Sequence, residues 1–550
     1  MIRFHAFTPG VLLILAGLTV SSARGDAVRD EIALRLDRAG SAGRLEAGGE
    51  VLSARHVLPD FYQRRDFEAA WKRDGNVDAL LQAIEDMQAD GLDPLDYHHE
   101  AIVRLRTAKS RSPADRAELD LLLTDALLRV AYHAYFGKVD PERLDPNWNI
   151  VTDIGDADPA KFVEDAIDGG RVAEAIASVK PQEPYYLALK QALARYRGIA
   201  AAGGWPLIPT GPTIAPGGHD ARVPVLRRRL AVTGDYAGAL PADSTLFDGA
   251  LADALKQFQY RMMMTADGVV GPGTTRALRI PVAQRIDEIR VDLERTRWVI
   301  RHLGERHVLV NVSSAQVYLL NHHKVEWSAR CQVGQTARQT PIFRADMRYL
   351  VFNPDWTVPR GILAKDILPA GKRGEAILER KKLVALDRKG ARVDPAAIQW
   401  SRYTASSFPY TLRQMPGPDN ALGQVKFMFP NKHSVYLHDT PSRDLFDKDV
   451  RTFSSGCIRV ERPLELAERL LDDRSKWSAE KIRQVVEAGR MTNVSLARPI
   501  PVLLLYFTVT IDAQGLIRFS DDLYQRDPRV LAALNEPFQL RRRPLSATRR

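Results

Sequence analysis

The 550-residue sequence contains only two cysteines, Cys331 and Cys457. So few thiols exclude a framework of several disulfides and a cysteine-rich zinc site. The even count leaves a single bridge between them open. Cys331 stands between Trp327 and Val333 in a strand-like run, and we interpret it as a small buried apolar side chain.

Long apolar runs are scarce as well. The first one, Val11–Val20, has about ten residues, whereas a membrane-spanning helix needs about 20. It follows the positive charge of Arg3 and precedes the small residues Ala23 and Gly25, which is the pattern of a secretory signal over residues 1–25. We therefore expect an exported, periplasmic protein, with an uncleaved signal that anchors the chain to the inner membrane as the alternative.

No dense Lys/Arg run is interleaved with aromatic residues, so we expect no nucleic-acid partner. The net charge of +10 still suits a partner with negative groups, such as an anionic cell wall or a membrane surface. The pairs His98-His99 and His322-His323 stand apart from carboxylate or cysteine clusters, so we expect no metal site. The basic end of the chain, within residues 536–550, is expected to be a disordered tail.

A chain of this length exceeds one hydrophobic core, and 45% apolar with 27% charged residues is typical of folded domains. Residues 28–220 show helical periodicity, as in Leu119–Ala134 and Tyr185–Tyr196, and carry no polar cluster with catalytic spacing. Glycines and prolines crowd residues 201–220, which indicates a linker or loop. We interpret residues 28–220 as a helical scaffold domain.

Residues 221–281 predict a small helical module. Two helix candidates, Val225–Leu230 and Phe247–Met263, precede a glycine-containing turn at Asp267-Gly268. The module resembles the three-helix peptidoglycan-binding type 1 domain through Leu226-Arg227, Ala254, Phe258-Gln259, Asp267-Gly268, Gly271, Thr274-Thr275 and Leu278. It departs from that pattern at Met262–Met264 and in the long segment Gly234–Ser244, so a purely structural helical module remains the alternative.

From residue 305 to 535 the pattern is that of a mainly-β domain. Val308–Val312 and Gln316–Leu320 predict a hairpin, followed by a third strand at Val325–Val333. A helix at Leu464–Leu471 and further strands are expected, the strands at Arg348–Phe352, Val425–Phe429, Ser434–His438, Pro501–Val509 and Leu516–Phe519. Residues 362–423 are too long for a plain loop, and we expect them to fold as an inserted lid. The whole chain is thus predicted to be a multidomain α+β protein.

The chemistry is concentrated around His438 and Cys457, which are 19 residues apart. A strand ending at His438 and a turn-like Ser-Ser-Gly-Cys run would bring the two side chains together. A free thiol has a pKa near 8.5, so a neighbouring histidine must take its proton before it can attack. The N–H groups of Ser455, Gly456 and Cys457 are candidates for an oxyanion hole. A buried cysteine and an unrelated histidine are the alternative.

The run Ser454–Val460 resembles the signature of YkuD-domain L,D-transpeptidases, a histidine followed by S-x-G-C-x-R. Pro416–Gly423 resembles the turn that precedes the histidine strand in that family, and Asn353–Pro359 and Val502–Asp527 are similar to its long, YcbB-like periplasmic branch. One departure is Ser455, where many members carry histidine.

The resemblance implies a Cys457 thioester enzyme that needs no cofactor and is a carbapenem target. It would take a tetrapeptide stem of peptidoglycan as donor and a diaminopimelate side chain of a second stem as acceptor, and so form a 3→3 cross-link. Water as acceptor would give carboxypeptidase activity. The implied role of Asp439 is to orient His438 through its backbone. Candidates for substrate binding are Arg459, Ser454, Asn420, Gly423, Trp356 and Tyr403.

Two alternatives remain open at this point. The acceptor could be a protein that becomes attached to the wall instead of a second stem. The chain could also be a non-catalytic scaffold that binds glycan strands of the cell wall.

Overall fold

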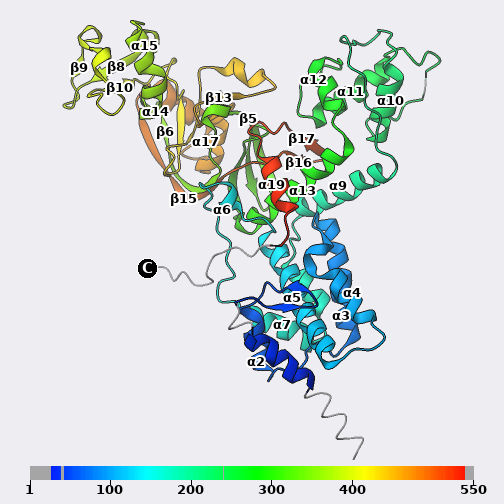
Figure 1. Cartoon of the computed structure of the whole chain (residues 1–550). Coiled ribbons are helices and arrows are strands. Elements are labelled where there is room, and N and C mark those ends of the chain that lie inside the picture. The colour runs from blue at the N-terminus through cyan, green and yellow to red at the C-terminus, as the bar shows by residue number, and fades with distance from the viewer. Residues whose placement is uncertain (1–26, 39–42, 240, 539–550) are drawn as a thin grey trace, which may run out of the picture.

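The computed structural model describes residues 27–38, 43–239 and 241–538 (Figure 1). The expected signal segment and the last residues of the expected tail lie outside these ranges. No helix within them is both long and apolar enough to cross a membrane.

The N-terminal part is helical and surrounds the long helix α5 (Pro113–Phe136). Ser112 and Asp115 form a reciprocal capping box at its start, and Pro113 fits the first turn because its missing N–H would have no helical partner there. The helices packed around it are α2 (Val57–Arg64), α3 (Asp74–Asp86), α4 (His99–Thr107), α7 (Pro159–Asp168) and α8 (Val172–Val179).

The module that follows contains α10 (Val223–Val232), α11 (Gly249–Arg261) and α12 (Pro272–Leu278). The side chain of Gln259 fixes its glycine turn, because Nε2 donates to Asp267 Oδ1 at 2.6 Å while Oε1 accepts from the N–H of Gly268 at 2.8 Å. Gly268 has a φ of +72°, which glycine adopts without strain. The motif residues thus build the turn itself.

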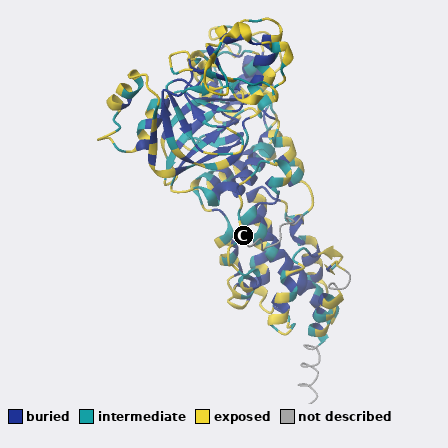
Figure 2. Ribbon diagram, turned by 90° about the vertical axis from the view of Figure 1, so that its left-hand side faces the viewer, coloured by how far each residue is buried: buried dark blue, intermediate teal, exposed yellow. Residues whose placement is uncertain are grey.

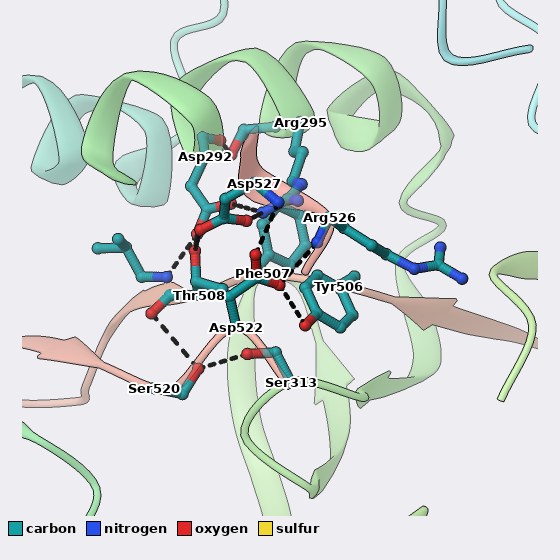
Figure 3. A network of polar contacts seen from close by, with 12 residues as sticks. Asp292, Arg295, Ser313, Tyr506, Phe507, Thr508, Ser520, Asp522, Arg526 and Asp527 are labelled. Carbon is teal, nitrogen blue, oxygen red and sulfur yellow. Dashed lines mark hydrogen bonds and ion pairs between the residues drawn. The ribbon is translucent and has the colours of Figure 1, made fainter. Parts of the chain in front are cut away.

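Helices α9 (Pro184–Ala201) and α13 (Val282–Val299) connect this module to the rest of the molecule (Figure 1). Figure 3 shows a buried polar network that joins α13 to residues 506–527 near the C-terminus. Arg295 Nη1 lies 2.9 Å from Asp292 Oδ1 and 2.6 Å from Asp527 Oδ1, and Thr508 donates to Asp527 at 2.7 Å. Burial raises the pKa of Asp292 to about 7, against the opposing effect of Arg295.

The β domain is built on a nine-stranded sheet in the order β13-β5-β14-β12-β11-β6-β15-β3-β4, and β4 also pairs with β5. The sheet therefore closes on itself, and its strands form the buried body seen in Figure 2. The strands are β3 (Arg306–Asn311), β4 (Gln316–Asn321), β5 (Lys324–Gly334), β6 (Phe343–Phe352), β11 (Val425–Met428), β12 (Leu437–His438), β13 (Thr452–Ser454), β14 (Ile458–Val460) and β15 (Thr492–Leu505).

Several strand predictions are confirmed. β3 and β4 form the expected antiparallel hairpin, β5 is the third strand, and Cys331 is fully buried in it. The predicted helix is α17 (Pro463–Leu471).

Two strand boundaries were wrong. The strand before His438 is shorter than predicted, because Ser434 has a φ of +54° that interrupts an extended chain. The predicted strand at Pro501–Val509 is divided: β15 starts at Thr492 and ends at Leu505, whereas β16 (Val509–Ile511) pairs with β17 (Ile517–Phe519) in a separate hairpin. The long antiparallel pairing of β15 with β6 extends this strand beyond its own local pattern.

The segment between β6 and β11 forms a separate unit, which we call the lid. Its sheet has the order β7-β10-β8-β9, formed by β7 (Trp356–Thr357), β10 (Thr411–Gln414), β8 (Leu383–Leu386) and β9 (Arg392–Val393). It has its own hydrophobic core, in which Ile367, Ala385 and Leu412 are almost completely buried. The unit takes in β7, which precedes residue 362, and projects from the edge of the domain (Figure 1).

Candidate active site

Strand pairing brings His438 and Cys457 to neighbouring positions of the sheet. β12 runs parallel to β14, with Leu437 opposite Ile458 and His438 opposite Arg459. The N–H of Ile458 donates to the carbonyl of Tyr436 at 3.1 Å, so Cys457, which directly precedes β14, lies at the level of Tyr436. Two segments separated by a long loop thus meet through backbone hydrogen bonds.

The His438 imidazole is buried, with 4% of its surface exposed. Its Nδ1 lies 2.5 Å from the carbonyl oxygen of Asp439, and donation from Nδ1–H to this carbonyl leaves Nε2 as a proton acceptor. Burial and the nearby charge of Arg459 lower the pKa of His438 to about 3. The ring is therefore neutral at physiological pH and available as a base.

In the described structure, the carboxylate of Asp439 makes no hydrogen bond to the His438 ring, which bonds to the Asp439 backbone carbonyl instead. The carboxylate accepts from the N–H of Gln424 at 2.9 Å, and burial raises its pKa. Gly423 allows this approach, because its φ is +59° and a Cβ at this position would stand 2.4 Å from the carboxyl group. Gly423 is therefore needed for the backbone that supports His438.

The Cys457 thiol is partly exposed, and its Sγ bonds to the carbonyl oxygen of Ser434 at 3.8 Å. Burial raises its pKa, while Tyr436, Lys426 and Arg459 act in the opposite direction. Lys426 lies opposite His438 on β11, and its Nζ is 4.1 Å from the centre of the Tyr436 ring. The positive charges of Lys426 and Arg459 thus favour the thiolate form of Cys457.

The described contacts include no hydrogen bond between Cys457 and His438. Such bonds are often long in a free enzyme and tighten when substrate is bound. Together with the low pKa of the imidazole, the geometry indicates a resting pair of neutral thiol and neutral base.

The loop before Cys457 is held in place by its own polar groups. Ser454 donates to the carbonyl of Cys457 at 2.6 Å and accepts from the N–H of Gly456 at 3.0 Å. Gly456 has a φ of +117°, and its carbonyl accepts from the Thr340 hydroxyl at 2.9 Å. Because the Gly456 N–H is engaged here, the oxyanion hole expected from Ser455, Gly456 and Cys457 stays a prediction.

Arg459 is oriented by a neighbouring amide. Its Nη1 donates to Gln332 Oε1 at 3.0 Å, and Gln332 in turn donates to the carbonyl of Ser442 at 3.0 Å. The buried Nε of Arg459 has no hydrogen-bond partner among the described residues. The Arg459 guanidinium is thus held close to the Cys457 thiol, and its Nε–H makes no hydrogen bond to the described residues.

The other residues proposed for substrate binding lie at the base and in the core of the lid. Asn420 is buried and donates to the carbonyls of Pro354 and Met415 at 3.0 and 2.9 Å, which secures the returning chain. Tyr403 packs in the lid core against an edge of Phe408. Their part in substrate binding stays a prediction.

Trp356 stands closer to Cys457. Both residues lie near the Tyr436 hydroxyl and affect its pKa, which burial raises. The part of Trp356 in substrate binding is likewise untested.

Sequence reasoning missed Lys426, Tyr436 and Arg338. Tyr436 could have been found, since the predicted strand Ser434–His438 places it two residues before His438 and therefore on the same face. Lys426 is revealed only by the register of β11 against β12, and Arg338 only by its contacts across the sheet edge.

A cavity of about 320 Å³ borders the turn between β5 and β6, where Gln339 and Ile342 line it. It is lined by residues of several domains, among them Trp148, Arg295, Gln339, Tyr506 and Arg526. Neither His438 nor Cys457 contributes to it. Within the described part of the chain, no group of three or more His, Cys, Asp or Glu side chains is arranged to hold a metal ion.

Residues 305–486 match the family model described as the L,D-transpeptidase catalytic domain. The chain carries an L,D-transpeptidase catalytic domain. Residues 219–278 match a model described as "Putative peptidoglycan binding domain", and residues 56–193 match a scaffold domain. The L,D-transpeptidase domain contains both His438 and Cys457.

A curated relative from Haemophilus influenzae, described as "Putative L,D-transpeptidase", is 33% identical over 229 residues. The match covers 42% of this chain and 46% of the relative, so the chain spans about half the length of that protein.

Among solved structures, an L,D-transpeptidase from Stackebrandtia nassauensis matches 54% of this chain and 97% of that chain, with 14% identity and a TM-score of 0.21. One from Xylanimonas cellulosilytica matches 54% and 99%, with 14% identity and a TM-score of 0.18.

Proposed function

We propose that this chain is an exported L,D-transpeptidase that forms 3→3 cross-links between peptidoglycan stem peptides in the cell envelope. The observation that carries the proposal is the pairing of β12 with β14, which sets His438 beside the Cys457 loop inside an L,D-transpeptidase domain. The chain itself supplies a nucleophile, a neutral base and two nearby cations.

In the first half of the reaction, Sγ of Cys457 attacks the carbonyl carbon of the bond between the third residue of a tetrapeptide stem and its terminal D-Ala. Nε2 of His438 accepts the thiol proton and passes it to the leaving amine as the C–N bond breaks. D-Ala departs, and the stem remains bound as a thioester. Lys426 and Arg459 lower the cost of the negative charge on sulfur.

In the second half, the side-chain amine of a diaminopimelate on another stem attacks the thioester carbonyl. His438 takes a proton from this amine and returns it to the sulfur as the C–S bond breaks. The product is a 3→3 cross-link and the free enzyme. If water attacks instead, the product is a tripeptide, which is carboxypeptidase activity.

The match of residues 219–278 to a peptidoglycan-binding model supports the proposal that the substrate is part of the cell wall. The helical module contacts the catalytic domain directly, since the N–H and hydroxyl of Thr265 donate to Asp449 Oδ1 at 2.9 and 2.6 Å. Tyr260 donates to Asp512 at 3.1 Å. We propose that the module holds glycan strands near the active site.

Two measurements on purified protein test the proposal. Intact mass after incubation with a carbapenem is expected to show one covalent adduct in the wild type and none in Cys457→Ala. Incubation with tetrapeptide-bearing muropeptides is expected to yield 3→3 dimers. A protein that binds peptidoglycan but forms neither adduct nor dimer would be a scaffold, and the enzymatic proposal would be wrong.

A further inference from the structure

The lid is attached to the catalytic domain by two chain crossings that lie side by side. The chain enters it after β6 and returns at β11, where Val425 pairs with Phe352 and the N–H of Asn353 donates to Gln424 at 2.8 Å. A unit with its own core on such a narrow attachment can rotate as a body unless a further contact holds it.

One such contact joins the body of the lid to the catalytic domain. Arg338 donates from Nη1 to Asp366 Oδ2 at 2.7 Å and from Nη2 to Asp366 Oδ1 at 2.6 Å. Asp366 belongs to the helical turn η5 (Leu363–Ile367) of the lid, and Arg338 ends the turn η4 (Thr336–Arg338) after β5. At the base of the lid, Trp356 of β7 also lies near the Tyr436 hydroxyl. Among the described residues, no other hydrogen bond or ion pair joins residues 360–413 to the chain outside residues 354–423.

The same guanidinium reaches the nucleophile loop. Its Nη1 also donates to the hydroxyl of Ser455 at 3.0 Å, two residues before Cys457. The backbone just before Arg338 supports that loop as well, because the N–H of Gln335 donates to the carbonyl of Ser454 at 3.0 Å. Arg338 therefore contacts the lid and the nucleophile loop at once.

We propose that Arg338 and Asp366 are positioning residues for the transfer step, which couple the position of the lid to the Cys457 loop. This inference rests on the proposed function. With the ion pair formed, the lid stays over the thioester and Ser455 is held in place, so the acceptor amine competes well against water. With the pair broken, the lid moves and water gains access.

The strength of the contact suits this role. The two side chains retain 22% and 36% of their exposure, so the pair is neither buried nor fully solvated. The two parallel hydrogen bonds fix its geometry, and hydrogen bonding to Arg338 lowers the pKa of Asp366. Its loss is expected to change a ratio of products several-fold without unfolding the protein.

The first test measures how much of the Cys457 thioester reacts with the acceptor amine and how much reacts with water. Asp366→Asn and Arg338→Gln are expected to lower the ratio of cross-linked to hydrolysed product about fivefold, with the rate of Cys457 acylation changed by less than about twofold. Glu379→Gln is the matched control, since Glu379 is an exposed lid carboxylate that makes no hydrogen bond or ion pair among the described residues. The exchanged pair Arg338→Glu with Asp366→Arg is expected to recover most of the wild-type ratio.

The second test needs no activity. Spin labels on Lys389→Cys in the lid and Lys476→Cys in the catalytic domain, in a Cys457→Ala background, report the lid position by pulsed dipolar spectroscopy. Asp366→Asn is expected to broaden the distance distribution, whereas Glu379→Gln leaves it narrow. Unchanged product ratios together with an unchanged distribution in Asp366→Asn would overturn the inference. Failure of the wild type to form any adduct or cross-link would instead overturn the proposed function.

Discussion

The electrostatics at this site bear most directly on the protonation state of Cys457 and His438 in the free protein. A pKa of about 3 for His438, against 6.5 for an ordinary histidine, corresponds to about 5 kcal/mol in favour of the neutral ring. Burial also raises the pKa of Cys457. We therefore predict that the free enzyme contains neutral thiol and neutral imidazole, and not a preformed thiolate–imidazolium pair.

The rate of Cys457 alkylation by iodoacetamide between pH 5 and 10 measures this directly, because only the thiolate reacts. A neutral pair predicts that the rate falls about tenfold for each pH unit below the thiol pKa, or about 100-fold from pH 8 to pH 6. His438→Ala is expected to leave this profile almost unchanged, although it removes the base needed for substrate.

Peptide mapping separates Cys457 from Cys331, whose thiol is fully buried with its pKa raised to about 12. A rate that stays flat between pH 5 and 8 in the wild type, and becomes steep in His438→Ala, would refute the reasoning. It would show that the ion pair exists in the free enzyme.

Three further predictions concern catalysis, folding and the lid. Cys457→Ala and His438→Ala are each expected to abolish cross-linking with an unchanged circular dichroism spectrum; turnover near the wild-type rate by either variant would contradict the assigned roles. Gly423→Ala is expected to cost about 2–4 kcal/mol in thermal unfolding, because a Cβ would clash at 2.4 Å, whereas Gly489→Ala, with a similar φ and open space, is expected to cost about 1 kcal/mol. Replacement of residues 362–423 by a short Gly/Ser linker is expected to shift the product from cross-links to tripeptides; a folded deletion variant with an unchanged product ratio would argue against the lid role.

Local patterns were enough to predict a large part of the architecture. The two β-type runs Val308–Val312 and Gln316–Leu320, with a short gap between them, identified the first hairpin. The Gly- and Pro-rich stretch over residues 201–220 was predicted to separate the scaffold from the module. Where long-range pairing extends a strand, as in β15, the sequence signal was misleading, because β propensity depends on the neighbouring strand as much as on the residues themselves.

The sequence by itself determined which chemical groups are candidates for the site. A cysteine after a glycine, a histidine at a strand end and their spacing are local features, and they predicted the nucleophile and the base. The tertiary structure alone decided the electrostatic setting, since the low pKa of His438 arises from burial and from Arg459 on a neighbouring strand. It also decided that Arg338 and Asp366, 28 residues apart, meet beside Ser455. Contacts across strand registers and inserted units depend on how the whole chain packs, and no local pattern encodes them.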